Sequence, residues 1–292
     1  MTARQAPYAF EILIKTFLRP HKVRRLVASI EAHYPGVTIR VADDSPDSPA
    51  RDAMVSALQA RGCRVYRLAA HAGISAGRNH LVREVQTPFF VLTDDDKVFD
   101  HRTVLERLQT VLEGDTSAVI AAGMNLDYGR LLRYQHGRLE RDGMVLRRHL
   151  FGEQAPAVTV GGIRCVPCDV TPNFFMARTA WVRSRGLAWD ERFKVGHGEH
   201  VWFFASLPRD LRVYSVPSVR ISHFPTRWGD RAYRQFRYDV TELDRFTAVT
   251  GIRVDTVWEY ESRWRARRRR LESWLRHTAD RLVAMGSARG TR

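Results

Sequence analysis

The first 122 residues alternate short apolar runs with stretches in which apolar residues recur every three or four positions. The runs predict buried strands, and the three- and four-residue spacing predicts helices that lay one face on a sheet. Strands that alternate with helices build mainly parallel sheets, so the sequence predicts an α/β fold. The expected strands are residues 10–14, 37–41, 65–68, 88–92 and 118–122, and the expected helices carry residues 23–34, 54–58, 81–85 and 104–112. Ser75 is expected to cap the third of these helices.

The second half of the chain continues this pattern less regularly. Residues 123–170 are rich in Gly and Arg, and we expect an irregular insertion here, a hairpin or loop over one edge of the sheet. A strand over residues 173–177, a helix over 197–207 and strands over 211–221, broken by Pro217, complete the pattern. The sequence therefore predicts one domain over residues 1–225.

The last segment, residues 226–292, differs in composition because it holds 16 Arg, no Lys and nine acidic residues. Apolar residues from Trp264 to Met285 recur at helical steps beside the run Arg267 to Arg270, which predicts a basic amphipathic helical extension. The apolar stripe of this helix either packs on the domain or on a second copy of the chain, or it contacts an anionic membrane surface. The sequence is compatible with both alternatives.

The formal net charge of +15 favours polyanionic neighbours such as nucleic acid, anionic lipids or phosphorylated substrates. No run of about 18 apolar residues and no secretory signal is visible, so we expect a cytoplasmic protein that is at most peripheral at the inner face of the membrane. Without such a signal, Cys63, Cys165 and Cys168 are expected to be reduced thiols. The spacing of Cys165 and Cys168 lacks the second pair of a zinc site.

The residues with the clearest chemistry are Asp94, Asp95 and Asp96, which follow the expected strand over residues 88–92. Three adjacent carboxylates repel one another, and the carboxyl ends of parallel strands are where α/β folds bind ligands. A divalent cation that bridges Asp96 and a diphosphate would neutralise them. The alternative is an acidic turn that caps the next helix, which the preceding apolar strand makes less favourable.

Polar residues also follow the second and third strands. Asp43 and Asp44 end the strand over residues 37–41, so one carboxylate could accept the N–H of a uracil ring, although an Asx-turn fits equally well. The segment Gly73 to Asn79 joins the third strand to a helix, and its Arg78 can bind a phosphate with two hydrogen bonds. The segment is neither a P-loop nor a dinucleotide-binding motif, since it lacks Gly-Lys-Ser/Thr and Gly-x-Gly-x-x-Gly.

Two residues near later elements complete the candidate site. Glu199 lies at the start of the expected helix over residues 197–207, where a carboxylate can take the proton of an attacking hydroxyl. The helix dipole alone also favours a glutamate at this place. His223 follows the last strand and can supply a neutral imidazole nitrogen to a metal, although a lone histidine is more often structural.

Taken in order, these segments resemble the GT-A glycosyltransferases of family 2, and more closely the β-1,4-N-acetylgalactosaminyltransferases related to ganglioside GM-two synthase. The resemblance spans residues 12–223 and is carried by Ile14-Lys-Thr-Phe-Leu-Arg19, Ala42-Asp-Asp-Ser45, Ala76-Gly-Arg-Asn79, Thr93-Asp-Asp-Asp96, Asn173-Phe-Phe-Met-Ala-Arg178 and His197-Gly-Glu199. Several ordered matches are far more specific than any one of them. The resemblance implies a nucleotide-sugar-binding GT-A domain.

The resemblance also implies an activity and a role for each matching residue. The expected reaction is an inverting transfer of N-acetylgalactosamine or a related sugar from a UDP-sugar to a hydroxyl of a glycan, glycolipid or other small acceptor. The implied roles are Thr16 and Asp44 near the uridine, Arg78 near the diphosphate, Asp94 or Asp95 near the ribose, Asn173 and Asp169 near the donor sugar, Asp96 and His223 as ligands of Mn²⁺ or Mg²⁺, and Glu199 as the base. Asp43 and Asn79 lie in the same donor-binding segments. The animal enzymes of this kind are membrane-anchored and luminal, so acceptor and compartment do not carry over.

Two other classes of protein fit some of these features. The charge and the arginine-rich tail suggest a nucleic-acid-binding protein, but no reader motif is recognisable, and the acidic triplet would repel phosphates without a metal. A sugar nucleotidyltransferase on a related fold would need a Gly-rich, Arg-containing loop after its first strand, where Lys15, Thr16 and Phe17 stand. We therefore expect no nucleic-acid partner, while an oligomer is compatible with the sequence.

Overall fold

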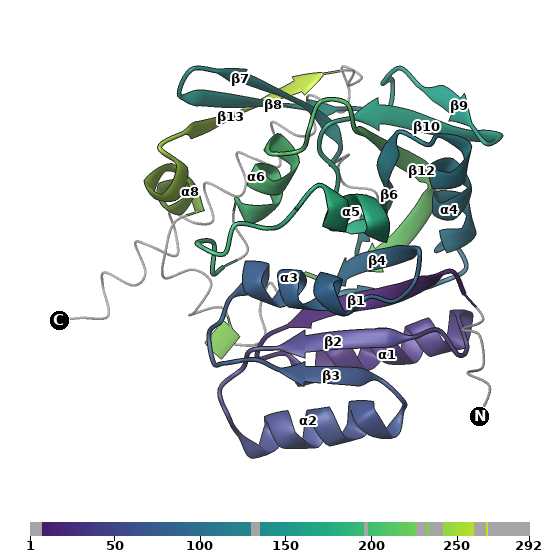
Figure 1. Ribbon diagram of the computed structural model, residues 1–292, viewed down its shortest axis with the longest axis vertical. Helices are drawn as coiled ribbons and strands as arrows, with labels where there is room; N and C mark the ends of the chain where they lie inside the picture. Colours follow the sequence, from purple (N-terminus) through teal and green to yellow (C-terminus); the bar gives the residue numbers. More distant parts are fainter. Residues whose placement is uncertain are drawn as a thin grey trace.

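The computed structural model of the chain describes residues 8–129, 135–195, 198–225, 232–233, 242–259 and 267 (Figure 1). Within these residues a large mixed sheet contains β1 (Phe10–Thr16), β2 (Ile39–Asp43), β3 (Arg64–Arg67), β4 (Phe89–Asp94), β5 (Lys97–Val98), β6 (Ala118–Asp127), β9 (Val158–Val160), β10 (Ile163–Cys168), β11 (Phe174–Arg178) and β12 (Arg212–His223). The order of its strands is β3-β2-β1-β4-β11-β6-β12-β10-β9, and β5 pairs with β12.

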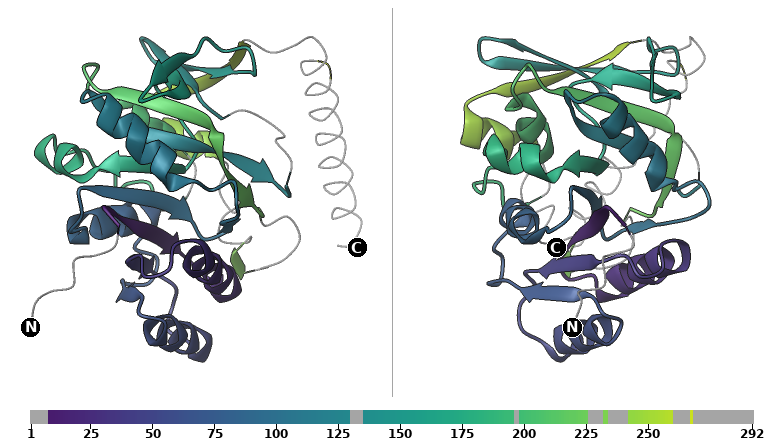
Figure 2. Two further views of the ribbon diagram at one scale, coloured as in Figure 1. Left: turned by 90° about the vertical axis from the view of Figure 1, so that its right-hand side faces the viewer. Right: turned by 45° about the vertical axis from the view of Figure 1, so that its right-hand side comes forward.

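The remaining elements are helices and a second, smaller sheet. The helices are α1 (Pro20–His33), α2 (Pro49–Ala60), α3 (Ile74–Glu84), α4 (Leu105–Gly114), α5 (Thr179–Ser184), α6 (Glu199–Ala205) and α8 (Glu242–Thr250). The smaller sheet contains β7 (Gly137–Asp142), β8 (Val145–Phe151) and β13 (Arg253–Glu259), in the order β13-β8-β7. Figures 1 and 2 show this sheet at the end of the molecule opposite α2.

The large sheet separates two apolar layers because successive residues of a strand face opposite sides. On β1, the buried Ile12 and Ile14 belong to the layer that includes α1, α2 and α4. Leu13, between them, belongs to the layer that includes α3, α5 and α6. Because helices cover both faces, the central strands are apolar at nearly every position, which is why they were recognisable in the sequence.

Strand pairing brings the ends of distant segments together. β1 runs parallel to both β2 and β4, so Thr16 lies opposite Asp43, and Lys15 lies opposite Asp94. β12 runs parallel to β6 and antiparallel to β5, which places His223 beside Asp127 and Lys97. The polar residues that end these strands therefore gather at one edge of the sheet.

The structure differs from the sequence-based expectations in three places. Helix α3 begins at Ile74 with Gly73 as its N-cap, so Ser75 lies inside the helix and does not cap it. Residues 123–170, expected as an irregular insertion with a hairpin or loop, contain the end of β6 and two hairpins, β7–β8 and β9–β10, so the segment is more regular than expected. These strands gave little signal because β7, with the sequence Gly-Arg-Leu-Glu-Arg-Asp, is mostly exposed and polar.

The third difference concerns the C-terminal extension. Residues 242–259 form α8 and β13, and β13 pairs in parallel with β8, so this part of the segment expected as a helical appendage belongs to the fold. The amphipathic helix expected from Trp264 to Met285 lies outside the described residues. No helix in the described ranges is long and apolar enough to cross a membrane.

Candidate active site

A cavity opens at the carboxyl ends of β1, β2 and β4 and reaches the start of α6. It offers about 680 Å³ of atom-free space, part of it open to solvent. Among the residues that line it are seven expected from the sequence: Thr16, Asp44, Arg78, Asp94, Asp96, Asn173 and Glu199. Acids and bases that are far apart in the chain therefore share one cavity.

Asp96, one of the two expected metal ligands, lines this cavity, whereas His223, the other, lies next to Asp96 without lining the cavity itself. Nε2 of His223 is 3.4 Å from Oδ1 of Asp96, a buried oxygen with no hydrogen-bond donor among the described residues. Nδ1 of His223 lies 2.6 Å from Oδ1 of Asp127, which holds the ring with Nε2 towards Asp96. Burial acts to raise the pKa of Asp96, but His223 and the cations Arg19 and Lys97 outweigh it and hold that pKa well below its usual range.

Asp95 is completely buried and does not line the cavity. Its oxygens accept hydrogen bonds from Thr16 Oγ1, at 2.6 Å, and from Arg19 Nη2. Burial raises the pKa of Asp95 to about 6, although the charge of Arg19 opposes the shift. Asp95 therefore holds Thr16 and Arg19 in place from the buried side of the cavity wall. Of Asp94 and Asp95, the two acids expected near the ribose, Asp94 is the one that faces the cavity.

Arg78 connects two expected site residues. Its guanidinium is fully buried and donates to Oε1 of Glu199 at 2.9 Å and to Oδ1 of Asp94 at 3.0 Å. The pKa of Asp94 is lowered because Lys97 and Arg78 outweigh the opposing effect of burial. Arg78 thus holds the two carboxylates at a fixed separation. The sequence suggested a contact of Arg78 with the diphosphate and gave no sign of these two ion pairs.

Lys97 is a buried cation that sequence reasoning missed. Its Nζ lies 3.7 Å from Oδ2 of Asp94 and donates a hydrogen bond to the backbone carbonyl of Asn173. Burial lowers its pKa, although the acids around it oppose this shift. The amide oxygen of Asn173, at the cavity wall, is buried without a hydrogen-bond donor among the described residues.

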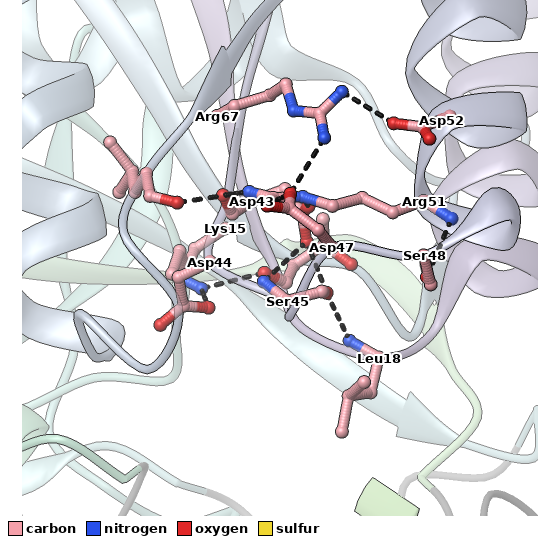
Figure 3. Close-up of polar contacts among 12 residues, drawn as sticks. Lys15, Leu18, Asp43, Asp44, Ser45, Asp47, Ser48, Arg51, Asp52 and Arg67 are labelled. Atoms are coloured by element: carbon pink, nitrogen blue, oxygen red, sulfur yellow. Dashed lines mark hydrogen bonds and ion pairs between the residues drawn. The ribbon is translucent and has the colours of Figure 1, made fainter.

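Asp43 and Asp44 have different surroundings (Figure 3). Asp43 accepts from the Ser45 backbone N–H at 3.2 Å and from Arg51 Nε at 2.6 Å, so it forms the Asx-turn alternative and stays outside the cavity lining. Asp44 lines the cavity, where it accepts from Lys15 Nζ and from the Gly73 backbone N–H, the latter at 2.7 Å. Asp44 therefore joins the ends of β1 and β2 to the start of α3.

Two further expected residues serve the walls of the site. Asn79 exchanges two hydrogen bonds with the backbone of Trp189, at 2.8 and 2.9 Å, and does not reach the cavity. Asp169 accepts from the Leu139 backbone N–H at 2.8 Å and anchors β7. The contacts of both residues are therefore structural, and neither residue lines the cavity.

Glycines make two close approaches possible. Gly73 has a φ of 105°, and a Cβ there would lie 2.8 Å from Cα of Lys194, a cavity residue. Gly198 has a φ of 93°, and a Cβ there would lie 2.6 Å from the ring of Phe246 in α8. Gly198 is the N-cap of α6, so α8 packs directly behind the residue that precedes Glu199.

Residues that sequence reasoning missed are mainly the cations that accompany the acids. Lys15 lies near the end of β1, Arg19 follows this strand, and both line the cavity. Lys97 begins β5, and Asp127 ends β6. Lys15 could have been recognised from the sequence because it directly follows an expected strand, and Lys97 because it stands next to the acidic residues that follow another. Asp127 gave no such signal, because β6 was expected to end at residue 122.

With this geometry in place, comparison with known proteins decides the family. Residues 11–168 match the family described as Glycosyl transferase family 2. The chain belongs to this family. It is 34% identical over 241 residues, 78% of its length, to human beta-1,4 N-acetylgalactosaminyltransferase 1, as the resemblance in sequence indicated. Those residues cover 42% of the human protein, so the family member described here spans less than half the length of that relative.

Solved structures confirm the α/β, GT-A fold. S. aureus TarS in complex with UDP-GlcNAc has a TM-score of 0.57 at 16% identity, over 82% of this chain and 64% of TarS. GalNAc-T7 with UDP, GalNAc and Mn²⁺ has a TM-score of 0.54 at 13% identity, over 75% of this chain and 44% of GalNAc-T7. At 16% and 13% sequence identity, these two structures show that the fold is shared and carry no conclusion about donor or acceptor.

Proposed function

We propose that this chain is an inverting, divalent-metal-dependent glycosyltransferase that moves a sugar from a UDP-sugar to a hydroxyl of a glycan, glycolipid or other small acceptor. The observation that carries the proposal is the convergence of Asp94, Asp96 and Glu199 on one cavity. The name of the human relative supports N-acetylgalactosamine or a related sugar as the transferred group.

Asp96 and His223 fit a divalent cation. The buried Oδ1 of Asp96, which accepts no hydrogen bond from the described residues, and the nearby Nε2 of His223 form a carboxylate–imidazole donor pair that suits Mn²⁺ and, with more oxygen ligands, Mg²⁺. No group of three or more His, Cys, Asp or Glu within the described residues could hold a metal alone, so we expect the diphosphate to provide the other ligands. When bound, the cation would stabilise the negative charge of the departing UDP.

The residues around this pair suggest how the donor is oriented. Asp94 faces the cavity and can accept hydrogen bonds from ribose hydroxyls, and Asp44 follows the end of β2, on the other side of β1, where we expect the uracil. The free amide oxygen of Asn173 can accept from a hydroxyl or an amide of the sugar. Because Arg78 is occupied by Asp94 and Glu199, we assign it the role of holding both carboxylates in place.

Glu199 is the base in this proposal. Arg78 occupies its Oε1, and no described residue hydrogen-bonds Oε2, the atom that would take the proton from the acceptor hydroxyl. The hydroxyl oxygen would form a bond to the anomeric carbon as the bond from that carbon to UDP breaks, which inverts the configuration in one displacement. Release of the proton to solvent would restore Glu199.

The first test is a panel of UDP-sugars, with and without Mn²⁺, measured by thermal shift and by release of UDP. We expect stabilisation by at least one UDP-sugar and a larger effect with Mn²⁺. Salt-sensitive binding of DNA or RNA, combined with no response to UDP and Mn²⁺, would instead favour a nucleic-acid-binding protein.

Glu199→Gln tests the base. The amide keeps the size of the side chain but cannot take a proton, so we expect at least a 100-fold loss of kcat for transfer with UDP binding retained. Asp96→Ala should instead weaken Mn²⁺-dependent UDP binding. Full turnover by the Glu199→Gln enzyme would exclude Glu199 as the base.

A further inference from the structure

A second hollow lies where β12 passes the segment between β5 and α4 (β12 and α4 in Figure 1). It offers about 540 Å³ of atom-free space, part of it open to solvent, and none of its lining residues also lines the donor cavity. This arginine pocket is lined by His101, Arg102, Val104, Arg107, Ser218 and Arg220. Four of these six residues are basic and none is acidic, so the pocket is an electropositive surface that the proposed transfer reaction does not use.

An irregularity in β12 forms one wall of the arginine pocket. The pairing of β12 with β6 shifts register between Ser215 and Arg220, and Ser218 lies within this stretch. Such irregularities in a strand often redirect a side chain. Arg220 is also fixed from the other side, because its backbone N–H donates to the carbonyl of Arg102 at 3.0 Å and its carbonyl accepts from Thr103 Oγ1 at 2.8 Å. Backbone contacts therefore bring the two arginines together.

Much of the positive charge around the arginine pocket has no acidic partner among the described residues. Asp100 accepts from Nε of Arg102 at 2.9 Å and from its Nη2 at 2.6 Å, which neutralises this one guanidinium. Nε of Arg220 donates to the carbonyl of Pro217 at 3.1 Å. No described residue accepts from the terminal nitrogens of Arg220 or from the side chain of Arg107. Three guanidinium groups and one carboxylate leave a net of two positive charges.

We propose that the arginine pocket binds a phosphate group, an inference that does not depend on the proposed transfer reaction. Guanidinium groups bind phosphate oxygens through paired, charge-assisted hydrogen bonds, and Arg107 and Arg220 have N–H groups free for them. Ser218 can add a hydroxyl donor and His101 a ring N–H. The chemical class of the ligand is a phosphomonoester, whose charge of about −1.5 to −2 at neutral pH complements the two unmatched positive charges.

The arginine pocket adjoins the strand that carries the proposed metal ligand His223. Ser222 Oγ accepts from Arg102 Nη2 at 3.1 Å and donates to Asp100 Oδ2 at 2.9 Å, and Ser222 precedes His223 in β12. A phosphate in the pocket would therefore lie beside this strand and leave the donor cavity open. The phosphomonoester can be a soluble molecule or the headgroup of a lipid such as phosphatidic acid, and the experiment separates these two sources.

The test uses the full chain and two double variants that lose the same charge. The pocket variant combines Arg107→Gln with Arg220→Gln. The control variant combines Arg64→Gln with Arg83→Gln, because both residues are exposed, bond no described residue through their side chains and line neither cavity. Binding of inorganic phosphate and glycerol 3-phosphate is measured by phosphorus NMR in EDTA. Unfolding temperatures without ligand verify that both variants fold, and the thermal shift with UDP and Mn²⁺ monitors the donor cavity.

We expect both phosphate compounds to bind the wild type and the control variant alike and to bind the pocket variant roughly tenfold or more weakly, with the UDP response unchanged. Equal binding by the pocket and control variants overturns the proposal, as does absence of phosphate binding to the wild type. Loss of the UDP response in the pocket variant alone also overturns it, because the arginines would then support the donor cavity. A wild type that binds phosphate and does not respond to UDP keeps this proposal and contradicts the proposed function.

Sedimentation with phosphatidylcholine vesicles that contain phosphatidic acid identifies the source of the phosphate. Weaker vesicle binding by the pocket variant than by the control variant assigns the pocket to a lipid headgroup. Equal vesicle binding by the two variants, together with the loss of glycerol 3-phosphate binding in the pocket variant, assigns it to a soluble phosphomonoester.

Discussion

Asp94, Asp95 and Asp96 are adjacent in the chain, yet each contacts a different set of cations. Arg78 and Lys97 accompany Asp94, Arg19 contacts Asp95, and His223 and Arg19 flank Asp96. The protein's own side chains therefore offset much of the repulsion that the sequence suggested a metal must remove. Of the three, Asp96 has a buried oxygen that accepts no hydrogen bond from the described residues, which is why the metal proposal depends on this residue and His223.

Asp127 offers a test at the scale of one residue. As a carboxylate it keeps the proton of His223 on Nδ1 and leaves Nε2 free to bind a cation. In Asp127→Asn the amide can donate to Nδ1 and so favour the tautomer with the proton on Nε2, and we expect Mn²⁺ affinity to fall 10- to 100-fold. The measurement is Mn²⁺ binding by EPR in the presence of UDP.

Asp100→Asn is the matched control, because Asp100 accepts hydrogen bonds from Arg102 and from Ser222, the neighbour of His223 in β12, without touching His223 itself. Equal Mn²⁺ affinity in the Asp127→Asn and wild-type proteins would show that Asp127 does not orient the imidazole.

At the scale of elements, the sequence predicted the buried central strands, and the partly exposed β3 beside them, but missed the exposed strands of the smaller sheet. β1, β4 and β11 are buried along nearly their whole length and are mainly apolar, whereas β7 and β13 carry charged residues whose partners lie elsewhere in the chain. The acids of the site were recognisable because they follow apolar strands. Their partners were not, since contacts such as that between Arg19 and Asp95 join residues 76 positions apart.

The start of α3 gives a prediction at this scale. Gly73 has φ 105° and ψ 164°, a region that only glycine adopts readily, and a Cβ there would collide with the backbone of Lys194. We expect Gly73→Ala to lower the free energy of unfolding by roughly 2–4 kcal/mol and to weaken UDP binding, because Ile74 and Lys194 line the cavity.

Gly62→Ala separates backbone strain from the collision. Gly62 has a φ of 83°, and a Cβ there would meet no atom within 4 Å. Chemical denaturation and UDP titration of both variants provide the comparison. If Gly73→Ala costs no more than Gly62→Ala and binds UDP normally, the contact with Lys194 does not shape the cavity.

At the scale of the whole molecule, the expected boundary at residue 225 divides elements that pack together. Phe246 and Ile252 share an apolar cluster with Leu146, Phe193 and Val201, the last of which lies in α6. Because α6 begins at Glu199, residues 242–259 support the proposed base. A change in charge composition therefore did not mark a structural boundary here.

The stability of the molecule should depend on pH through buried histidines. Burial lowers the pKa of His136 to about 4 and that of His200 to about 3. In the unfolded chain both would titrate near 6.5, so between that pH and about 4 the unfolded state binds more protons. Their contribution is complete above pH 6.5 and is lost as the pH falls, by roughly 2 kcal/mol for each group at pH 5.

His136→Gln isolates one of these contributions, because Asp95, with its raised pKa, acts in the opposite direction over the same range. Urea denaturation at pH 7 and pH 5 should show a smaller loss of stability in the variant than in the wild type. An equal loss in both would mean that His136 takes up a proton in the folded state as readily as in the unfolded one.

The pairing of β13 with β8 joins residues 108 positions apart, as between Arg148 and Thr256. During translation, every residue of the proposed donor site from Thr16 to His223 is synthesised before β13. Until then the nascent protein presents an unpaired edge of β8 and lacks the packing of Phe246 behind Gly198. We expect the growing chain to become competent for transfer only after residues 242–259 have been made, and that open edge to be the first surface that a chaperone or a second nascent chain encounters.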